Sequence, residues 1–152
     1  TLNKNKHNLV VHESDLPKGK GFAPMAWQIL EGKKIIPVCL IEAATNVDSG
    51  RIWLKDQIIL TGDELCEDWR QLQGDKTIEI CLRFISEYNL INPIEQSGDS
   101  TYYKRRRPVD SEINPDRSIR EQMNLLRIVD NVRYPGFFYI NGIKYEIQIK
   151  KI

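Results

Sequence analysis

Residues 8–32 read NLVVHESDLPKGKGFAPMAWQILEG and predict a strand, a constrained loop and a helix in direct succession. The β-branched, apolar run at 8–12 is typical of a short buried strand. Proline and glycine residues in the loop 13–22 restrict its backbone to a tight path. Pro24 suits the first turn of a helix, whose apolar spacing then stops at a glycine. This succession favours an α/β fold and leaves His12 at the end of the strand.

Two further strands and a long helix are predicted in the middle of the chain. The runs IIPVCLIEA (about 36–43) and RIWLKDQIIL (51–60) are strand-like. Residues 63–88 have the spacing of an amphipathic helix, in which Gly74 allows either a bend or a break into two helices. The predicted apolar stripe of this helix consists of Leu65, Trp69, Leu72, Ile78, Leu82 and Ile85.

The chain after residue 92 has a different character. Residues 95–115 are polar and contain prolines and a glycine, which predicts an excursion without regular structure. A helix is predicted at 118–131, where Ser118 and Glu121 have the spacing of a capping box. The end of the chain is predicted to form a β-hairpin with a type I′ turn at Asn141-Gly142.

The order of these elements predicts a two-part organisation. Residues 1–91 fit the second half of an open, twisted α/β sheet, and residues 92–152 fit a small α+β subdomain that ends in the hairpin. A complete doubly wound sheet needs more strands and crossovers before residue 8. We therefore expect the sequence to be a fragment, or incomplete at its start.

The composition is that of an ordinary globular domain, with 152 residues, 41% hydrophobic and 28% charged. A net charge of +1 does not favour general binding to nucleic acid or to an anionic membrane. No apolar run approaches the ~20 residues of a membrane span, and the first residues lack the apolar region of a signal peptide. Cys39, Cys66 and Cys81 form no CxxC pair, which predicts free thiols, a cytoplasmic location and no metal site.

His12 and Asp48 are the candidate catalytic residues. Ligands of an open α/β sheet bind beyond the carboxyl ends of the strands, and each of these two side chains follows a predicted strand. A carboxylate beside an imidazole orients the ring and stabilises its charged form. The spacing alone favours a plainer interpretation, in which His12 ends a strand and Asp48 fills a turn.

The stretch HESDLPKGKGFAPMAWQIL resembles the HxSLLP…RG…P…W signature of the folate-dependent formyltransferases. NVDSGRI resembles the D-x-G turn of that family, with Asp48 in the position of its catalytic aspartate. YYKRRRPVDSEI, NLLRIVDN and YPGFF resemble the segment that follows the catalytic domain in the branch acting on nucleotide-linked amino sugars. The resemblance covers the whole chain and implies the second half of an open Rossmann-like formyltransferase sheet.

The resemblance also implies a reaction. In this family a formyl group moves from N10-formyltetrahydrofolate to an amine, here that of a nucleotide-linked amino sugar. His12 would donate to the formyl oxygen, where negative charge develops, and Asp48 would orient and charge His12.

The resemblance assigns further residues to the two ligands. Lys18 and Lys20 are compatible with a substrate phosphate, and equally with solvated loop charges. The loop matching the family's folate-side loop would approach the pterin with its backbone, although a plain connecting loop fits the same residues. That loop consists of Ala44, Thr45, Asn46 and Val47.

One departure from the family pattern leaves alternatives open. Val10 stands where the family has an asparagine, so the chain is either an enzyme that uses another donor or a non-catalytic relative that binds folate or a nucleotide sugar. A His–Asp pair also fits a formyltetrahydrofolate hydrolase, in which it activates water. A fourth alternative is methionyl-tRNA formyltransferase.

The basic run 104–107 is a clue to the kind of partner that the chain binds. It is either an RNA footprint, a site for a smaller anion, or a set of charges paired with Asp110 and Glu112. The near-zero net charge disfavours nucleic acid as a partner. The hairpin and its apolar tail make a homodimer edge plausible.

Overall fold

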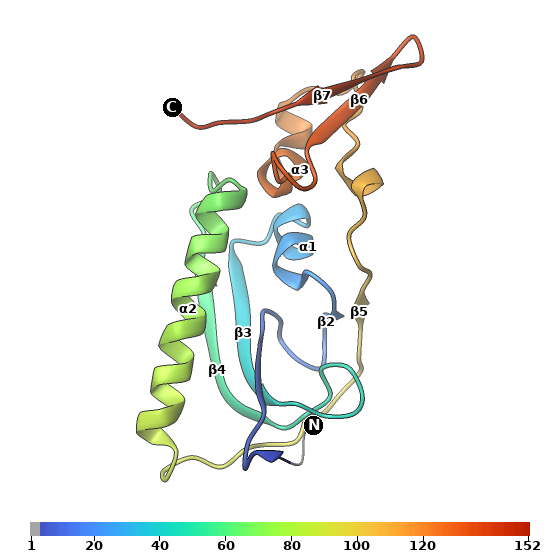
Figure 1. The fold of residues 1–152 in the computed structure, drawn as a ribbon. Helices are drawn as coiled ribbons and strands as arrows, with labels where there is room; N and C mark the ends of the chain where they lie inside the picture. The colour runs from blue at the N-terminus through green and yellow to red at the C-terminus, as the bar shows by residue number, and fades with distance from the viewer. Residues whose placement is uncertain (1–3) are drawn as a thin grey trace.

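A three-stranded antiparallel sheet in the order β1-β3-β4 forms the centre of the computed structural model, which describes residues 4–152 (Figure 1). Its strands are β1 (Leu9–His12), β3 (Ile35–Glu42) and β4 (Ile52–Ile59). The helices are α1 (Pro24–Leu30), α2 (Cys66–Glu87) and α3 (Met123–Ile128), with short 3₁₀ turns at η2 (Pro108–Ser111) and η3 (Arg120–Gln122).

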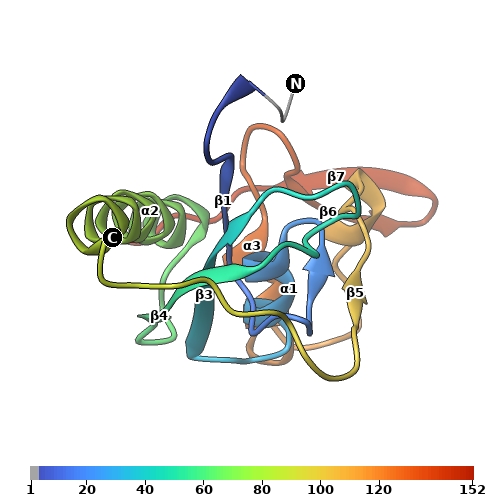
Figure 2. The same ribbon diagram turned by 90° about the horizontal axis from the view of Figure 1, so that it is seen from below.

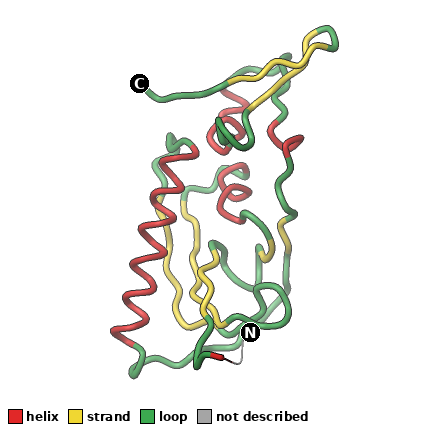
Figure 3. Tube along the Cα trace, in the orientation of Figure 1, coloured by secondary structure: helices red, strands yellow, loops and turns green. Residues whose placement is uncertain are grey.

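Two smaller strand pairs complete the fold. β2 (Lys20–Gly21) pairs in parallel with β5 (Tyr102–Tyr103), and β6 (Gly136–Ile140) pairs antiparallel with β7 (Ile143–Ile147). Figure 2 shows α2 on one side of the central sheet and the β2–β5 pair on the other. The mixed α/β fold class with open sheets is confirmed, and Figure 3 shows how much irregular chain joins its elements.

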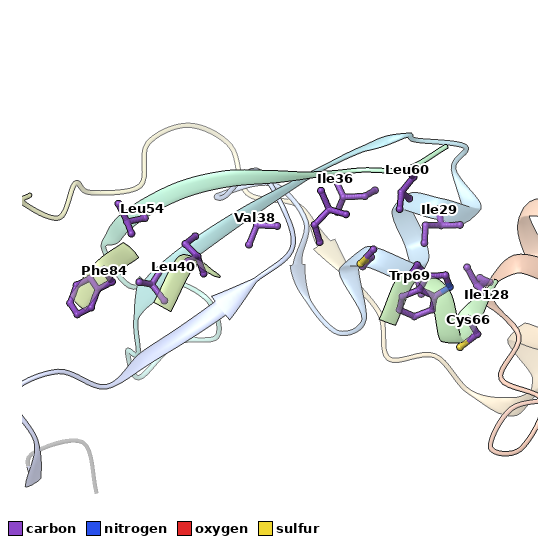
Figure 4. Packing of buried hydrophobic residues seen from close by; sticks show 14 residues of the cluster. Ile29, Ile36, Val38, Leu40, Leu54, Leu60, Cys66, Trp69, Phe84 and Ile128 are labelled. Carbon is purple, nitrogen blue, oxygen red and sulfur yellow. The ribbon is translucent and has the colours of Figure 1, made fainter. Parts of the chain in front are cut away.

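The main core lies where the sheet meets the helices. Ile29 of α1, Leu40 of β3 and Ile80 of α2 are all fully buried in it. Trp69 of α2 and Ile128 of α3 extend the same cluster towards the later part of the chain (Figure 4). No helix within residues 4–152 is both long and apolar enough to cross a membrane.

The predicted apolar stripe of the long helix is wrong in its second half. The helix is unbroken through Gly74, but Ile78, Leu82 and Ile85 are 61%, 61% and 71% exposed. Ile80 and Phe84 are buried instead. These two residues pack into the main core, and beside them the carboxylate of Asp56 in β4 binds two cations of α2. Those partners are Lys76, at 3.3 Å, and Arg83, at 2.8 Å.

The helix predicted at 118–131 is shorter than expected. Ser118 and Glu121 do form the capping box, since the backbone N–H of Glu121 donates to Ser118 Oγ and the backbone N–H of Ser118 donates to Glu121 Oε2. The following residues are split between η3 and α3, and the chain is extended again at Val129. The expected excursion at 95–115 contains β5 and η2.

The chain on either side of residue 92 is joined by direct contacts. Ile52 of β4 forms an antiparallel bridge with Ile94, with both backbone hydrogen bonds at 2.8 Å. Trp69 Nε1 donates to the carbonyl oxygen of Arg127 at 3.0 Å. The division into residues 1–91 and 92–152 stays a prediction.

Glu64 and Arg127 form a buried ion pair between the two parts, 3.0 Å from Oε2 to Nη2. Burial raises the pKa of the Glu64 carboxyl, but hydrogen bonds from the hydroxyl and backbone N–H of Thr61 and the backbone N–H of Gly62 outweigh it and lower the pKa to about 2. The carboxylate therefore stabilises the fold above its unfolded pKa near 4.5, and this contribution is lost as the pH falls towards 2.

Glu64→Gln should therefore lower the free energy of unfolding at neutral pH by about 3 kcal/mol, because Arg127 is left buried without its counter-charge. The difference from wild type should shrink as the pH falls through the acid range. Denaturant unfolding at a series of pH values measures both effects, with the exposed Glu67→Gln as the control. If the free energy of unfolding of Glu64→Gln fell with acid pH as steeply as that of wild type, the assignment would be contradicted.

Candidate active site

His12 is the last residue of β1 and lies opposite Cys39, in the middle of β3. The two strands are antiparallel, so the carboxyl end of β3 at Glu42 lies beside Leu9, the first residue of β1. The sequence-based reason for placing His12 near Asp48, that two strands end at a common rim, is therefore wrong. The loop after Glu42 folds back instead and carries Asp48 to His12.

Asp48 sits in a turn with a left-handed backbone, φ 49°, and its Oδ2 lies 3.5 Å from His12 Nδ1. The two side chains are only 14% and 6% exposed. The backbone N–H of Gly21 donates to Asp48 Oδ2 at 2.8 Å, which anchors the carboxylate. The expected proximity of His12 and Asp48 is thus present in the structure.

The other ring nitrogen of His12 holds the imidazole in place. Nε2 lies 2.8 Å from the carbonyl oxygen of Gly19, and since a carbonyl only accepts, Nε2 carries the proton. Nδ1 faces Asp48 at a separation longer than an ordinary hydrogen bond. The ring is therefore fixed at Nε2, and Nδ1 can donate a hydrogen bond only when the ring carries a second proton.

Glycines make this arrangement sterically possible. Gly21 has φ +101°, and a Cβ there would lie 2.4 Å from the carbonyl oxygen of Tyr103 on β5. At Gly50, two residues after Asp48, a Cβ would lie 1.6 Å from the carbonyl oxygen of Glu42. Neither site accepts a side chain unless the backbone moves, so the loop glycines and the glycine of D-x-G are spatial requirements of the site.

Gln96 is a site residue that the sequence did not indicate. Its Nε2 donates to the carbonyl oxygens of Asp48 and Gly50, each at 2.8 Å, and so ties the aspartate turn to the segment after residue 92. No local pattern marks a single glutamine in a polar excursion. Only the three-dimensional return of that segment to the turn reveals it.

Glu13 is a second residue that the sequence did not indicate, although it directly follows His12. It is 8% exposed, and its Oε1 accepts from Gln73 Nε2 at 2.7 Å. Burial raises the pKa of the Glu13 carboxyl, although the Gln73 hydrogen bond and the charge of His12 oppose the shift. The charged form of Glu13 therefore costs stability once the pH exceeds its unfolded pKa.

Glu13→Gln should raise the melting temperature at neutral pH and leave it close to wild type at pH values below the unfolded pKa. The amide keeps an oxygen for Gln73 and removes the buried charge. Thermal unfolding at pH 7 and under acid conditions measures the change, with the exposed Asp99→Asn as the control for charge removal. A lower melting temperature at neutral pH would contradict the assignment.

The two predicted phosphate-binding lysines differ in their surroundings. Lys18 is exposed and lines a cavity of about 300 Å³, together with Ser14, Lys33 and Tyr103. Ser14 Oγ is buried without a hydrogen-bond partner in residues 4–152. Lys20 is only 6% exposed, so it is not a solvated loop charge.

The predicted folate-side loop lies next to the candidate pair. Residues 44–47 are all exposed and lead directly into Asp48. Ser49 Oγ donates to the carbonyl oxygen of Asn46 at 2.9 Å, which closes the turn. The loop therefore presents a small, accessible surface beside His12 and Asp48. Within residues 4–152, no group of three His, Cys, Asp or Glu side chains is arranged to hold a metal ion.

The basic run 104–107 makes contacts within the chain. Lys104 pairs with Asp110 at 2.7 Å, which confirms part of one expected alternative, but within residues 4–152 Glu112 forms no ion pair with the run. Arg105 lies over the ring of Phe22, 4.4 Å from its centroid. Arg106 Nη1 donates to the carbonyl oxygen of Ile128 at 2.7 Å. Much of this run is therefore structural.

No family model matches the chain, but individual proteins do. The methionyl-tRNA formyltransferase of Thermodesulfovibrio yellowstonii is 30% identical over 125 residues, which cover 80% of this chain and 41% of that protein. Over most of its length, this chain is similar to the folate-dependent formyltransferases. It spans less than half the length of the curated formyltransferases it matches.

Solved formyltransferases have the same fold. A methionyl-tRNA formyltransferase from Clostridium thermocellum superposes with a TM-score of 0.81 at 24% identity, covering 98% of this chain and 65% of that one. A 4-N formyltransferase from Francisella tularensis gives a TM-score of 0.77 at 19% identity, covering 99% of this chain and 65% of that one. These structures show that the chain has the formyltransferase fold, and their names give more than one kind of acceptor.

Proposed function

We propose that this chain carries the catalytic pair of an N-formyltransferase that moves a formyl group from N10-formyltetrahydrofolate to the amine of a nucleotide-linked amino sugar. The observation that carries the proposal is the buried His12–Asp48 pair, 3.5 Å apart, in a chain that is similar to the formyltransferases. Two glycine contacts hold this pair, from the Gly19 carbonyl to His12 and from the Gly21 N–H to Asp48.

In the proposed reaction the amine nitrogen bonds to the formyl carbon, and the carbon–N10 bond breaks. The amine loses one proton and N10 gains one, so the protons balance. Because the Gly19 carbonyl fixes Nε2, we assign to His12 Nδ1 the hydrogen bond to the developing oxyanion. Asp48 stabilises the charged ring and accepts the amine proton on its way to N10.

The two ligands are assigned to two different loops near this pair. The exposed loop 44–47 would hold the pterin by its backbone, since it leads into Asp48. Lys18 would bind a phosphate of the acceptor, a role supported by the adjacent cavity and the unpartnered hydroxyl of Ser14. Lys20 is buried, so it would contribute its charge to the phosphate site from beneath the loop. A cytoplasmic location is part of the proposal, and the three cysteines are free thiols.

The acceptor is assigned to the amino-sugar class because the basic run is engaged in contacts within the chain. Lys104 and Arg106 are held by Asp110 and by a backbone carbonyl, and this leaves less of the run for RNA. Methionyl-tRNA is the second candidate, because the curated relatives carry that activity in their names.

The test is a formyl-transfer assay with N10-formyltetrahydrofolate and three parallel conditions. The acceptors are a set of nucleotide-linked amino sugars, charged methionyl-tRNA, and no amine. We expect a formamide on an amino sugar, detected by mass spectrometry. A product on tRNA alone transfers the assignment to the second candidate, and formate release without amine indicates a hydrolase.

Calorimetry with a stable folate analogue separates an enzyme from a binding protein. Val10, the residue that replaces the family's asparagine, is 40% exposed on β1, so a missing donor is a concrete reason for weak catalysis. Binding of the analogue without any product would overturn the enzyme and support the non-catalytic alternative.

A further inference from the structure

The loop after β1 borders a cavity of about 300 Å³. One part of its wall is apolar and includes Ile35 and Pro37 of β3. The polar part includes Ser14 and Lys18 of the loop and Thr101, the residue before β5. The residues around this cavity therefore come from three segments that lie far apart in the sequence.

Several hydrogen-bond donors of this cavity have no acceptor. Ser14 is 2% exposed, and its hydroxyl has no partner within residues 4–152. A buried hydroxyl without a partner is unfavourable, so Ser14 indicates a missing acceptor. Thr101 Oγ1 accepts the backbone N–H of Gly19 at 2.8 Å, which leaves the proton of the threonine hydroxyl available. Lys18 is exposed and forms no ion pair in the part of the chain that the structure describes.

An anion is the kind of ligand that fits these donors. Among the lining residues within 4–152, only Asp15 has a carboxylate, and Lys55 Nζ binds its Oδ1 at 3.0 Å. Lys33 adds a second ammonium group to the lining, with its Nζ 2.9 Å from Glu31 Oε2. Two ammonium groups and two hydroxyls match the oxygens of a phosphate, which accept charge-assisted hydrogen bonds.

Gly19 connects this cavity to the candidate catalytic histidine. Its N–H donates to Thr101 Oγ1, and its carbonyl oxygen accepts from His12 Nε2, both at 2.8 Å. A Cβ at Gly19 would lie 2.9 Å from Tyr103 Cε2 and 3.0 Å from Ser14 Cβ, so the loop is closely packed there. Ser14 provides a second link, because its N–H donates to the carbonyl oxygen of His12 at 3.0 Å. A ligand bound to Ser14 and Thr101 would therefore hold the loop at both of its contacts with His12.

We propose that this cavity binds a phosphate of the acceptor and that the bound phosphate keeps His12 in position through Gly19. The source of the phosphate rests on the proposed function. Ser14 and Thr101 donate their hydroxyl protons to phosphate oxygens, and Lys18 supplies positive charge. Because the loop that binds the phosphate also fixes the imidazole, the phosphate raises turnover as well as affinity for the acceptor. Ser14 and Thr101 are positioning residues and do not touch the reacting atoms.

Inorganic phosphate is the first probe, and NMR spectroscopy of the full chain is the readout. The chain has two histidines, so the His7→Asn variant assigns the imidazole signals of His12. We expect phosphate to shift the His12 signals saturably and to leave those of His7 in place, whereas chloride at equal ionic strength shifts neither.

Ser14→Ala tests the site itself. It should weaken phosphate binding by roughly tenfold, the usual loss when one hydrogen bond to a charged group is removed. The fold should be retained, because the Ser14 hydroxyl has no partner to lose within residues 4–152. Ser86→Ala, at an exposed position of α2, is the matched control. His12 signals that do not respond to phosphate, or that respond equally in Ser14→Ala, would overturn the proposal.

Formyl transfer to a truncated acceptor tests the link to catalysis. The truncated acceptor is the amino sugar without its nucleotide, assayed with and without inorganic phosphate. We expect phosphate to raise the turnover of this acceptor in the wild-type chain, and to raise it much less in Ser14→Ala. Free phosphate should compete with the intact acceptor and slow its formylation. Faster formylation of the intact acceptor, or no effect on the truncated one, contradicts the proposal.

The two experiments separate this inference from the proposed function. If no amino sugar is formylated, the proposed function fails and the assigned source of the phosphate fails with it, whereas the response of the His12 signals decides the phosphate site by itself. If the intact acceptor is formylated and phosphate does not bind, only the phosphate site is wrong.

Discussion

His12→Asn should lower the rate of formyl transfer by ~10²–10³, the usual loss when one donor to an oxyanion is removed. Asparagine retains a polar group at the site but has no ring to be fixed by Gly19 and charged beside Asp48. The melting temperature should change little by comparison. Steady-state turnover together with thermal unfolding measures both quantities on the same sample.

His7→Asn is the matched control, because His7 is the other histidine of the chain. Its ring nitrogens contact Tyr88 Oη at 2.7 Å and Glu42 Oε2 at 3.1 Å, and its ring packs edge-on against Trp53. Losing these contacts should lower the melting temperature and leave turnover per folded molecule unchanged. Wild-type turnover in His12→Asn, or an equal loss in both variants, contradicts the catalytic assignment.

Gly50→Ala should have the largest effect on stability, with a loss of more than ~4 kcal/mol in the free energy of unfolding. The added Cβ would lie 1.6 Å from the Glu42 carbonyl oxygen and 2.7 Å from the Glu42 carbonyl carbon, so the backbone must move. The movement also displaces Asp48, so transfer should fall even in the fraction that folds. Denaturant unfolding and the transfer assay follow the two effects.

Gly74→Ala is the control for this substitution. Gly74 lies inside α2, and a Cβ there would have no atom within 4 Å. The same chemical change should therefore stabilise the protein by roughly 0.5–1 kcal/mol through helix propensity. Similar effects of the two substitutions would mean that the contact between Gly50 and Glu42 is not as close as described.

The sequence predicts the local elements well where one residue decides the backbone. Pro24 begins α1, and Asn141-Gly142 forms the expected hairpin turn. It also predicts that His12 and Asp48 lie together, but through a wrong topology, because β1 and β3 are antiparallel and the loop after Glu42 makes the approach. The family resemblance, and not the carboxyl-end rule, is the sound reason for expecting these two residues to lie together.

Other features depend on contacts that no local pattern contains. The face of α2 that meets the sheet carries Ile80 and Phe84, with ion pairs to Asp56 beside it, so counting apolar residues gave the wrong stripe. Gln96 reaches Asp48 only because residues 94–96 return to β4. The role of the basic run depended on where Asp110 and Ile128 lie in space.

A double-mutant cycle on formyl transfer tests most directly whether His12 and Asp48 act as one unit. The variants are His12→Asn, Asp48→Asn and the combination, each assayed for turnover at saturating donor. If Asp48 acts through the ring of His12, the turnover of the combined variant should be only slightly lower than that of the slower single variant. Losses that multiply, or full turnover in Asp48→Asn, would contradict a catalytic pair.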